Sequence, residues 1–216
     1  MHGFFDETEH SEREYVFEAD GVPELRQKVL GWSYGECNVA WNDCMCWFAL
    51  HNGELFRGKS VLELGSGCGL VGLVVAHFAD RVTLSDGDEA ELPLLQRNVE
   101  LYSPPGCQVR ASLLDWGSDE NQELFDVVIG QEVAYLPACV PLLAKAIKRC
   151  LHPEGHAYIG NKHYATNTSA EGVKRLFLEA LREEGLIWED LPLTFLPPGR
   201  DLAPDDPTYV LHIRRA

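Results

Sequence analysis

The sequence predicts an α/β fold built on a doubly wound, mostly parallel sheet with an antiparallel strand inserted at one edge. From residue 60 onward, short apolar runs alternate with segments of helical length and period, which is typical of repeated strand–helix units. One run, "FDVVIG" at 125–130, is apolar on both faces, as a central parallel strand should be. Near the end, two strand-like runs follow each other without a helix between them, which predicts an antiparallel pair.

Each expected element follows from its own residues. Short apolar runs predict five strands at 60–64, 81–86, 107–112, 125–130 and 156–160. Helical spacing of apolar residues predicts helices at 69–79, 88–102, 140–151 and 170–185. Acidic residues open the second of these helices, where they suit the positive end of the helix dipole. The final hairpin is expected to join strands at 186–193 and 208–215.

The first 59 residues are expected to precede and cap this sheet. Residues 1–13 are acidic and predict a mobile tail without the features of a secretion signal. Residues 14–59 predict a cap, made of a hairpin that turns at Asp20-Gly21 and a helix at 39–53. No linker separates the cap from the main domain at 60–216, so we expect both to fold as one unit.

Composition and charge limit the partners of the chain. Its 216 residues suit one domain, and no apolar run approaches the roughly 20 residues of a membrane span. The net charge of −16 repels phosphate backbones, so we expect no nucleic acid partner and favour a basic protein, although solubility alone also explains the charge. The spacing of the seven cysteines fits no zinc site and indicates a reducing compartment. We therefore expect a cytoplasmic monomer without a metal, with the nucleus as an alternative location.

The stretch "VLELGSGCGL" at 61–70 places glycines and one carboxylate after an apolar strand. A strand that turns at once into a helix, with a ligand against its backbone, needs residues without a Cβ, such as Gly65 and Gly67. The spacing differs from the dinucleotide fingerprint G-x-G-x-x-G, and Glu63 would repel a pyrophosphate. A ligand with an ammonium, a sulfonium and a ribose fits better, which predicts S-adenosylmethionine. Asp86, at the end of the second strand, is expected to bind the ribose hydroxyls, unless it only caps the next helix.

With these residues established, the chain resembles the Rossmann-like, seven-strand methyltransferases. More narrowly, it is similar to the family 16 protein methyltransferases of the methyltransferase-like 21 type, over roughly residues 14–216. The resemblance rests on four motifs in order: "VAWNDCMCWFAL" with Trp41, "VLELGSGCGLVG", "LLDWG" with Trp116, and "GQEVAY" with Glu132 and Tyr135. The glycine motif alone is generic to methyltransferases, whereas all four in this order are specific to the family.

The resemblance implies a role for each matching position around the cofactor. From the methionine end to the adenine, these positions are Trp41, the loop of Gly65, Ser66 and Gly67, then Asp86 for the ribose and Trp116 for the adenine. Gln131 stands where the family usually has alanine and would touch the cofactor through its backbone.

The same resemblance implies that Glu132 and Tyr135 are the acid and tyrosine on the acceptor side. We expect Glu132 to attract and orient the incoming nitrogen while the proton leaves to water, and Tyr135 to line the acceptor channel. Two departures affect this site: Glu132 replaces the more common aspartate, and Asn42 precedes the usual acid in "WND". Either can shift the target preference, and neither removes the chemistry.

The acceptor implied by the resemblance is a nitrogen of a protein side chain, with lysine first. Histidine and arginine stay open, because relatives modify them and "GNKHYATNTSAEGVKRLF" at 160–177 bears a weak likeness to a stretch of the histidine-modifying enzymes. A small-molecule amine would also suit an acidic pocket. A nucleobase is disfavoured because no proline pair precedes Tyr135, and a nicotinamide-dependent oxidoreductase because of the glycine spacing. A scaffold that binds the cofactor without catalysis stays an alternative, against which Glu132 and Tyr135 argue.

Overall fold

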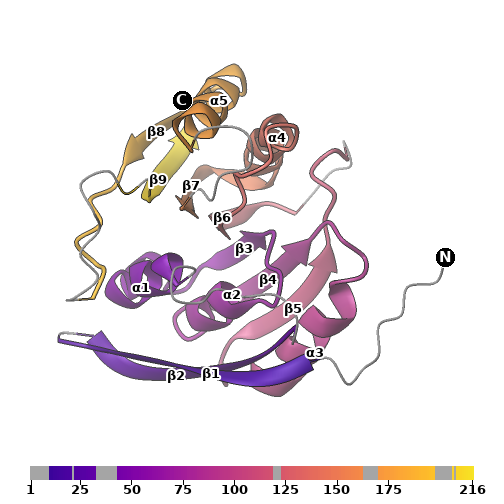
Figure 1. Cartoon of the computed structure of the whole chain (residues 1–216), viewed down its shortest axis with the longest axis vertical. Coiled ribbons are helices and arrows are strands. Elements are labelled where there is room, and N and C mark those ends of the chain that lie inside the picture. The colour runs from indigo at the N-terminus through magenta and orange to yellow at the C-terminus, as the bar shows by residue number, and fades with distance from the viewer. Residues whose placement is uncertain are drawn as a thin grey trace.

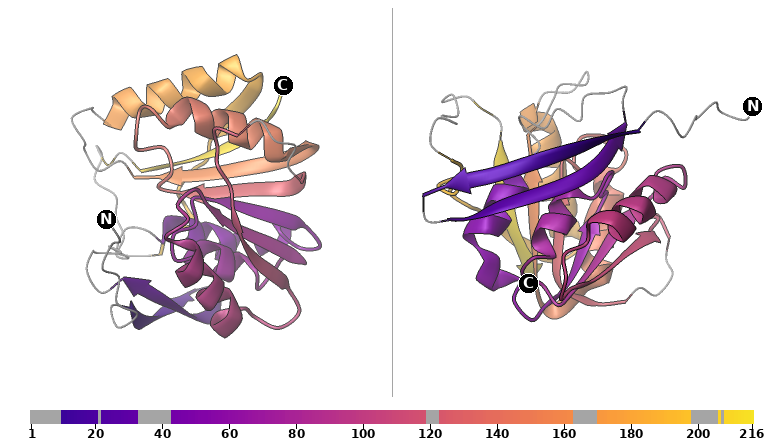
Figure 2. Two further views of the ribbon diagram at one scale, coloured as in Figure 1. Left: turned by 90° about the vertical axis from the view of Figure 1, so that its right-hand side faces the viewer. Right: turned by 90° about the horizontal axis from the view of Figure 1, so that it is seen from below.

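The computed structural model describes residues 10–20, 22–32, 43–118, 123–162, 170–197, 206 and 208–216. In this part of the chain, seven strands form one sheet that has helices on both faces (Figure 1). Helices α4 and α5 cover one face, and α1, α2 and α3 lie on the other, where a separate two-stranded hairpin forms an outer layer (Figure 2). The helices are α1 (Cys44–His51), α2 (Leu70–Val75), α3 (Leu92–Tyr102), α4 (Val140–Cys150) and α5 (Ala170–Glu183), with a short 3₁₀ turn, η2 (Gly53–Leu55).

The strands of the sheet follow the order β5-β4-β3-β6-β7-β9-β8. They are β3 (Ser60–Leu64), β4 (Arg81–Asp86), β5 (Gln108–Leu113), β6 (Phe125–Gln131), β7 (Leu151–Asn161), β8 (Leu186–Asp190) and β9 (Tyr209–Arg215). The first five strands in this order, β5, β4, β3, β6 and β7, pair in parallel, and β9 runs antiparallel to both of its neighbours. This order confirms the predicted doubly wound sheet and its antiparallel strand.

The two faces of the sheet form two separate hydrophobic cores. Along β3, Val61 packs with α1 and α2, whereas Leu62 and Leu64 pack with α4 and α5. All five residues of β3 are buried, as a strand covered on both faces requires. The order of the strands reverses at β3, with β4 on one side and β6 on the other, and such a reversal opens a crevice at the carboxyl ends of the strands.

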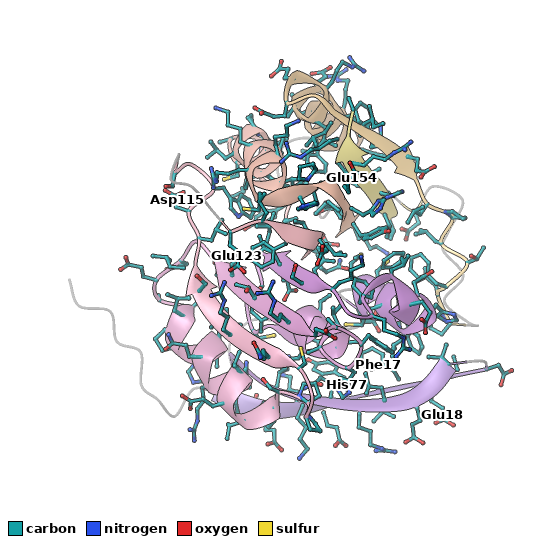
Figure 3. The ribbon with its side chains drawn as sticks, turned by 180° about the vertical axis from the view of Figure 1, so that it is seen from behind. Phe17, Glu18, His77, Asp115, Glu123 and Glu154 are labelled. Atoms are coloured by element: carbon teal, nitrogen blue, oxygen red, sulfur yellow. The ribbon has the colours of Figure 1, made fainter. Side chains whose placement is uncertain are left out.

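The hairpin consists of β1 (His10–Ala19) and β2 (Val22–Trp32), and Ala19 pairs with Val22 at the predicted turn. Because β1 begins at His10, residues 10–13 belong to this strand and not to the predicted tail, whose remaining residues 1–9 lie outside the described part. Alternation along β1 directs side chains to opposite faces. Figure 3 shows Phe17 on the inner face and Glu18 on the outer face.

Several contacts attach the hairpin to the domain, among them one ring contact and one hydrogen bond of a buried side chain. The ring of Phe17 meets that of Trp47 in α1 edge-on, with centroids 5.3 Å apart. Gln27 is buried in β2, and its amide donates a hydrogen bond to the backbone oxygen of Tyr102 in α3, at 3.2 Å. Phe17, Trp47 and Gln27 are buried in these contacts, so the hairpin packs against α1 and α3.

Several element boundaries differ from the prediction. Helix α3 begins at Leu92 and not at residue 88, because Asp86 and Asp88 accept hydrogen bonds from backbone N–H groups two residues ahead of each, and such turns compete with a helix. Helix α2 covers only Leu70–Val75. Strand β7 begins at Leu151, and its pairing with β6 is irregular until His156. The first residues of the helix predicted at 39–53 lie outside the described part, in which α1 begins at Cys44.

Two further observations concern the described residues as a group. No disulfide joins any two of the six cysteines among them, which are Cys44, Cys46, Cys68, Cys107, Cys139 and Cys150. Among the described residues, no helix has both the length and the apolar character that crossing a membrane requires.

Candidate functional site

A cleft of about 590 Å³ is lined by residues that follow strands β3, β4, β5 and β6. Its volume falls within the usual range of about 300–1,000 Å³ for small-molecule sites. The structure brings together six of the predicted site residues in its lining, which are Gly65, Gly67, Asp86, Trp116, Glu132 and Tyr135. The cleft is therefore the place where the predicted cofactor side and the predicted acceptor side meet.

The glycine loop turns the chain from β3 into α2 with a left-handed backbone. Gly65 has a φ of 63° and Gly67 a φ of 51°, a region that residues with a Cβ rarely adopt. At Gly65 a Cβ would also lie 2.8 Å from Cγ1 of Val133, whereas no heavy atom lies within 4 Å of one built at Gly67. Gly65 is thus required for packing, and Gly67 leaves open space for a ligand.

Asp86 lies at the end of β4, directly beside this loop. Its Oδ2 accepts a hydrogen bond from the backbone N–H of Gly67 at 3.0 Å, and its Oδ1 accepts one from Asp88 at 3.1 Å. A carboxylate has about four lone-pair sites, so each oxygen retains capacity for a ligand hydroxyl. This arrangement fits the predicted role of Asp86 at the ribose.

Glu63 is located behind the glycine loop and is not part of the cleft lining. Its side chain is buried, and Oε2 accepts a hydrogen bond from the backbone N–H of Gly72 in α2 at 3.1 Å. Burial raises the pKa of this carboxyl to about 8. The predicted contact of Glu63 with the cofactor stays a prediction. The hydrogen bond between Glu63 and Gly72 holds α2 against the glycine loop.

Ser66 also points away from the cleft. Its hydroxyl accepts a hydrogen bond from the backbone N–H of Ser85 at 2.9 Å, and its own backbone N–H donates to the oxygen of Ser85 at 2.8 Å. Ser66 therefore joins the loop to β4, which leaves its predicted contact with the cofactor untested.

Trp116 follows β5 in a turn that Arg149 of α4 secures. The guanidinium of Arg149 donates to the backbone oxygens of Asp115, at 3.2 Å, and of Ser118. Carbon Cζ2 of the Trp116 ring would lie 3.5 Å from a Cβ at Gly65, so the ring flanks the glycine loop. The motif "LLDWG" identifies Trp116, whereas Arg149 belongs to no motif and is recognised only by its contacts.

Glu132 occupies the first position after β6, with a φ of 55°. A side-chain-bearing residue in this region is strained by about 1–3 kcal/mol, and such strain is concentrated at functional sites. Its backbone N–H donates to the oxygen of Gly160 at 2.9 Å, and its Oε1 accepts a hydrogen bond from the backbone N–H of Lys162. Burial raises the pKa of Glu132 to about 7, although the hydrogen bonds that Glu132 accepts from Lys162 and Gln131 lower it.

The three remaining predicted residues differ in position. Tyr135 lines the cleft and is 46% exposed, as expected of a residue at the mouth of an acceptor channel. Gln131 is not part of the lining, and its side chain contacts Glu132 and helix α1. Trp41 lies outside the described residues.

Acidic residues dominate the charge of the cleft. Besides Asp86 and Glu132, its lining contains Asp88, Glu91 and Asp115, while none of the described lining residues is a lysine or arginine. The acids after Asp86 were predicted in the first turn of a helix, so their position at the cleft was not expected. The site is arranged for a cationic ligand, since each of these carboxylates favours positive charge nearby.

Comparison with solved structures defines the class of the fold. The crystal structure of a TehB-like SAM-dependent methyltransferase from Corynebacterium glutamicum matches with a TM-score of 0.58 at 18% sequence identity, covering 83% of this chain and 92% of that one. The fold is that of the seven-strand methyltransferases.

Comparison with known sequences identifies the family. The family described as lysine methyltransferase matches residues 32–183. EEF1A lysine methyltransferase 3 of Mus musculus is 36% identical over 123 residues, which cover 56% of this chain and 53% of that protein. Calmodulin-lysine N-methyltransferase of Arabidopsis thaliana is 34% identical over 122 residues, which cover 53% of this chain and 40% of that protein. The chain thus spans about half the length of these relatives.

The chain belongs to the lysine methyltransferase family. This membership confirms the family that the four sequence motifs predicted.

Proposed function

We propose that this chain is an S-adenosylmethionine-dependent N-methyltransferase that modifies a lysine side chain of a basic protein. The observation that carries this proposal is the single cleft in which the glycine loop, Asp86 and Trp116 meet Glu132 and Tyr135. Membership of the lysine methyltransferase family supports methyl transfer as the reaction and lysine as the acceptor. The names of the relatives identify their own substrates, and no particular substrate is carried over.

The residues of the cleft fit the cofactor. Gly67 leaves open space beside the loop, and Asp86 presents a carboxylate already fixed by two backbone N–H groups. Trp116 offers an aromatic ring next to that loop. The acidic lining suits a ligand with an ammonium and a sulfonium and disfavours one with phosphates.

When bound, S-adenosylmethionine supplies a methyl group on a sulfonium, which an acceptor nitrogen displaces in line. The task of the protein is to align that nitrogen and exclude water. A lysine must first lose a proton, and lowering its pKa from about 10.4 to about 7 corresponds to roughly 4.6 kcal/mol. Burial and a neighbouring positive charge both act in this direction.

Glu132 acts in the opposite direction on the pKa of a lysine, because a carboxylate favours the ammonium. Its proposed role is to attract and orient the incoming nitrogen, with the proton leaving to water. Tyr135, half-exposed at the same cleft, would line the path of the acceptor side chain.

The net charge of −16 and the acidic lining support a basic protein as the partner. We further propose that the protein acts as a monomer in the cytoplasm, with the nucleus as the alternative. The lack of a disulfide between the described cysteines is compatible with a reducing compartment.

Incubation of the purified chain with S-adenosylmethionine carrying a labelled methyl group and with cell extract tests the proposal. Mass spectrometry of the labelled protein is expected to place the methyl group on a lysine, and the Glu132→Gln variant should label far less. A methyl group on histidine, arginine or a small amine would show that the acceptor is wrong. Binding of the cofactor without any labelling would identify a scaffold that lacks catalysis.

A further inference from the structure

Gln131, the last residue of β6, connects helix α1 with the acceptor-side acid. Its Oε1 accepts a hydrogen bond from the backbone N–H of Met45 at 3.0 Å, and its Nε2 donates to Oε1 of Glu132 at 3.1 Å. A backbone N–H can only donate, so the amide oxygen must face Met45 and the amide nitrogen must face Glu132. The contacts themselves therefore determine the orientation of the amide.

The close approach of α1 depends on the absence of a side chain at Gly160 in β7. A Cβ there would lie 2.6 Å from Cγ of Met45 and 3.2 Å from Oε1 of Gln131. Met45 is 1% exposed and lies in the first turn of α1, whose N–H groups have no partner inside the helix. Gln131 satisfies one of these groups, and the same side chain contacts Glu132.

The two oxygens of Glu132 have different surroundings. Oε1 accepts hydrogen bonds from Nε2 of Gln131 and from the backbone N–H of Lys162. Among the described residues, Oε2 accepts no hydrogen bond, although Glu132 lines the cleft. Two donors thus fix one oxygen, and the other has no donor among the described residues.

We propose that Gln131 is a positioning residue for Glu132, which holds Oε1 of that carboxylate so that Oε2 faces the acceptor nitrogen. This inference rests on the proposed function, since it takes Glu132 as the group that orients the acceptor. Alanine, the usual residue of the resembled family at this position, has no donor and could not perform this role.

Two ionisable groups nearby are coupled to Glu132: Lys162 after β7 lowers its pKa, and Glu132 in turn raises the pKa of Tyr209 in β9. The other ionisable groups on the surrounding elements are Asp206, which pairs with Lys162 at 2.7 Å, Asp43 before α1, and Tyr135 and Asp86 in the cleft. Burial raises the pKa of Glu132, and the hydrogen bonds of Lys162 and Gln131 lower it. Removing the donor of Gln131 alone should therefore raise this pKa further while the other groups stay in place.

Two substitutions separate the two contacts of Gln131. In Gln131→Glu, an ionised carboxylate can still accept the hydrogen bond of Met45 but has no donor for Glu132. In Gln131→Met, a side chain of similar size makes neither hydrogen bond. In Gln131→Glu, the added carboxylate raises the pKa of Glu132 by repulsion whatever the role of Gln131, so Gln131→Met is the deciding variant. If Gln131 served only to dock α1, the pKa of Glu132 would not change in Gln131→Met.

The measurement is kcat/KM for methyl transfer to a lysine peptide of the identified substrate, from pH 5.5 to 9.5. The acidic limb is expected to move upward by about one pH unit or more in both variants, and further in Gln131→Glu, with activity at pH 7 at least about fivefold lower and recovering at high pH. The titration of the acceptor lysine is common to all three proteins and cancels in the comparison. Calorimetry should give cofactor affinities within about twofold of the wild type, because Gln131 does not line the cleft.

A second readout does not depend on activity. Titration of the Glu132 carboxyl carbon by ¹³C NMR, assigned by comparison with Glu132→Gln, should give a higher pKa in either folded variant than in the wild type. An unchanged pKa, or an unmoved acidic limb in a folded and active variant, overturns the role of Gln131. A wild-type protein that transfers no methyl group would instead overturn the proposed function, and the NMR titration would still decide the role of Gln131.

Discussion

The carboxylate of Asp86 and the backbone N–H of Gly67 form a hydrogen bond of 3.0 Å across the mouth of the cleft. This bond links the end of β4 to the glycine loop that follows β3. Asp86, which is predicted to bind the ribose, therefore also fixes the loop that is predicted to lie under the amino-acid portion of the cofactor. A change at Asp86 should therefore affect both parts of the cofactor site together.

Replacement of Asp86 by alanine is expected to weaken the binding of S-adenosylmethionine by at least about 100-fold. Hydrogen bonds to a charged group contribute about 1.5–3 kcal/mol each, and two ribose hydroxyls would lose their acceptor. Isothermal titration calorimetry measures the effect. Asp86→Asn retains one acceptor oxygen and should lie between alanine and the wild type.

Asp80 provides the matched control, because it is exposed and lies just before the amino end of β4. Asp80→Ala removes a carboxylate of the same charge at the far end of the same strand and should leave the affinity unchanged. Equal affinities of Asp86→Ala and the wild type would remove Asp86 from the cofactor site.

The two glycines of the loop should differ in their tolerance of a methyl group. Both have a left-handed backbone, so alanine at either position costs about 1–2 kcal/mol. Only at Gly65 does the new Cβ also meet Cγ1 of Val133, at 2.8 Å, and overpacking adds about 1–3 kcal/mol. Urea unfolding should thus show Gly65→Ala to be the less stable variant by at least about 1 kcal/mol.

The contact with Val133 can be tested directly by a double substitution. Adding Val133→Ala to Gly65→Ala removes the clash, so the loss in the double variant should be smaller than the sum of the two single losses. The same addition to Gly67→Ala should give simple additivity, because no heavy atom lies near a Cβ at that position. Additive losses in both pairs would show that the backbone conformation alone decides the difference.

The sequence predicts the sheet well because the order of the elements depends on hydrophobic period and turn residues, which are local. It predicts cleft residues that stand at the end of a strand or in a motif, such as Asp86 and Glu132. It does not reveal which way a side chain points: Glu63 and Ser66 belong to the glycine motif, yet their side chains bond to α2 and β4 behind the loop. Arg149 is separated from the turn it secures by about 30 residues, and only the folded chain brings the two together.

Glu132 should control turnover and its dependence on pH. Glu132→Gln or Glu132→Ala is expected to lower kcat by about 100-fold or more and to leave cofactor affinity nearly unchanged. In the wild type, protonation of Glu132, whose pKa lies at about 7, should lower kcat/KM as the pH falls below neutrality. Steady-state kinetics and calorimetry on the same preparations test both statements, and full activity in Glu132→Gln would contradict the role.

Glu63 should make the stability of the fold depend on pH. Burial raises its pKa to about 8 in the folded chain, from a usual value of 4.5. As the pH rises, Glu63 loses its proton at a lower pH in the unfolded state than in the folded state. Its contribution to the free energy of unfolding is therefore fully present below about pH 4.5 and is lost as the pH rises to about 8. Glu63→Gln carries no charge at any pH and can still accept the hydrogen bond of Gly72.

Urea unfolding of the wild type and Glu63→Gln at pH 5, 7 and 9 measures this loss. The free energy of unfolding of the variant, relative to the wild type, should increase between pH 5 and pH 9 by more than about 1.4 kcal/mol, the equivalent of one pKa unit. Glu100→Gln in α3 is the control, because the side chain of Glu100 is 67% exposed and its loss should give a difference that does not change with pH. Since Glu132 titrates in all three proteins, its effect cancels, and a constant difference for Glu63→Gln would show that Glu63 is ionised in the folded chain throughout this range.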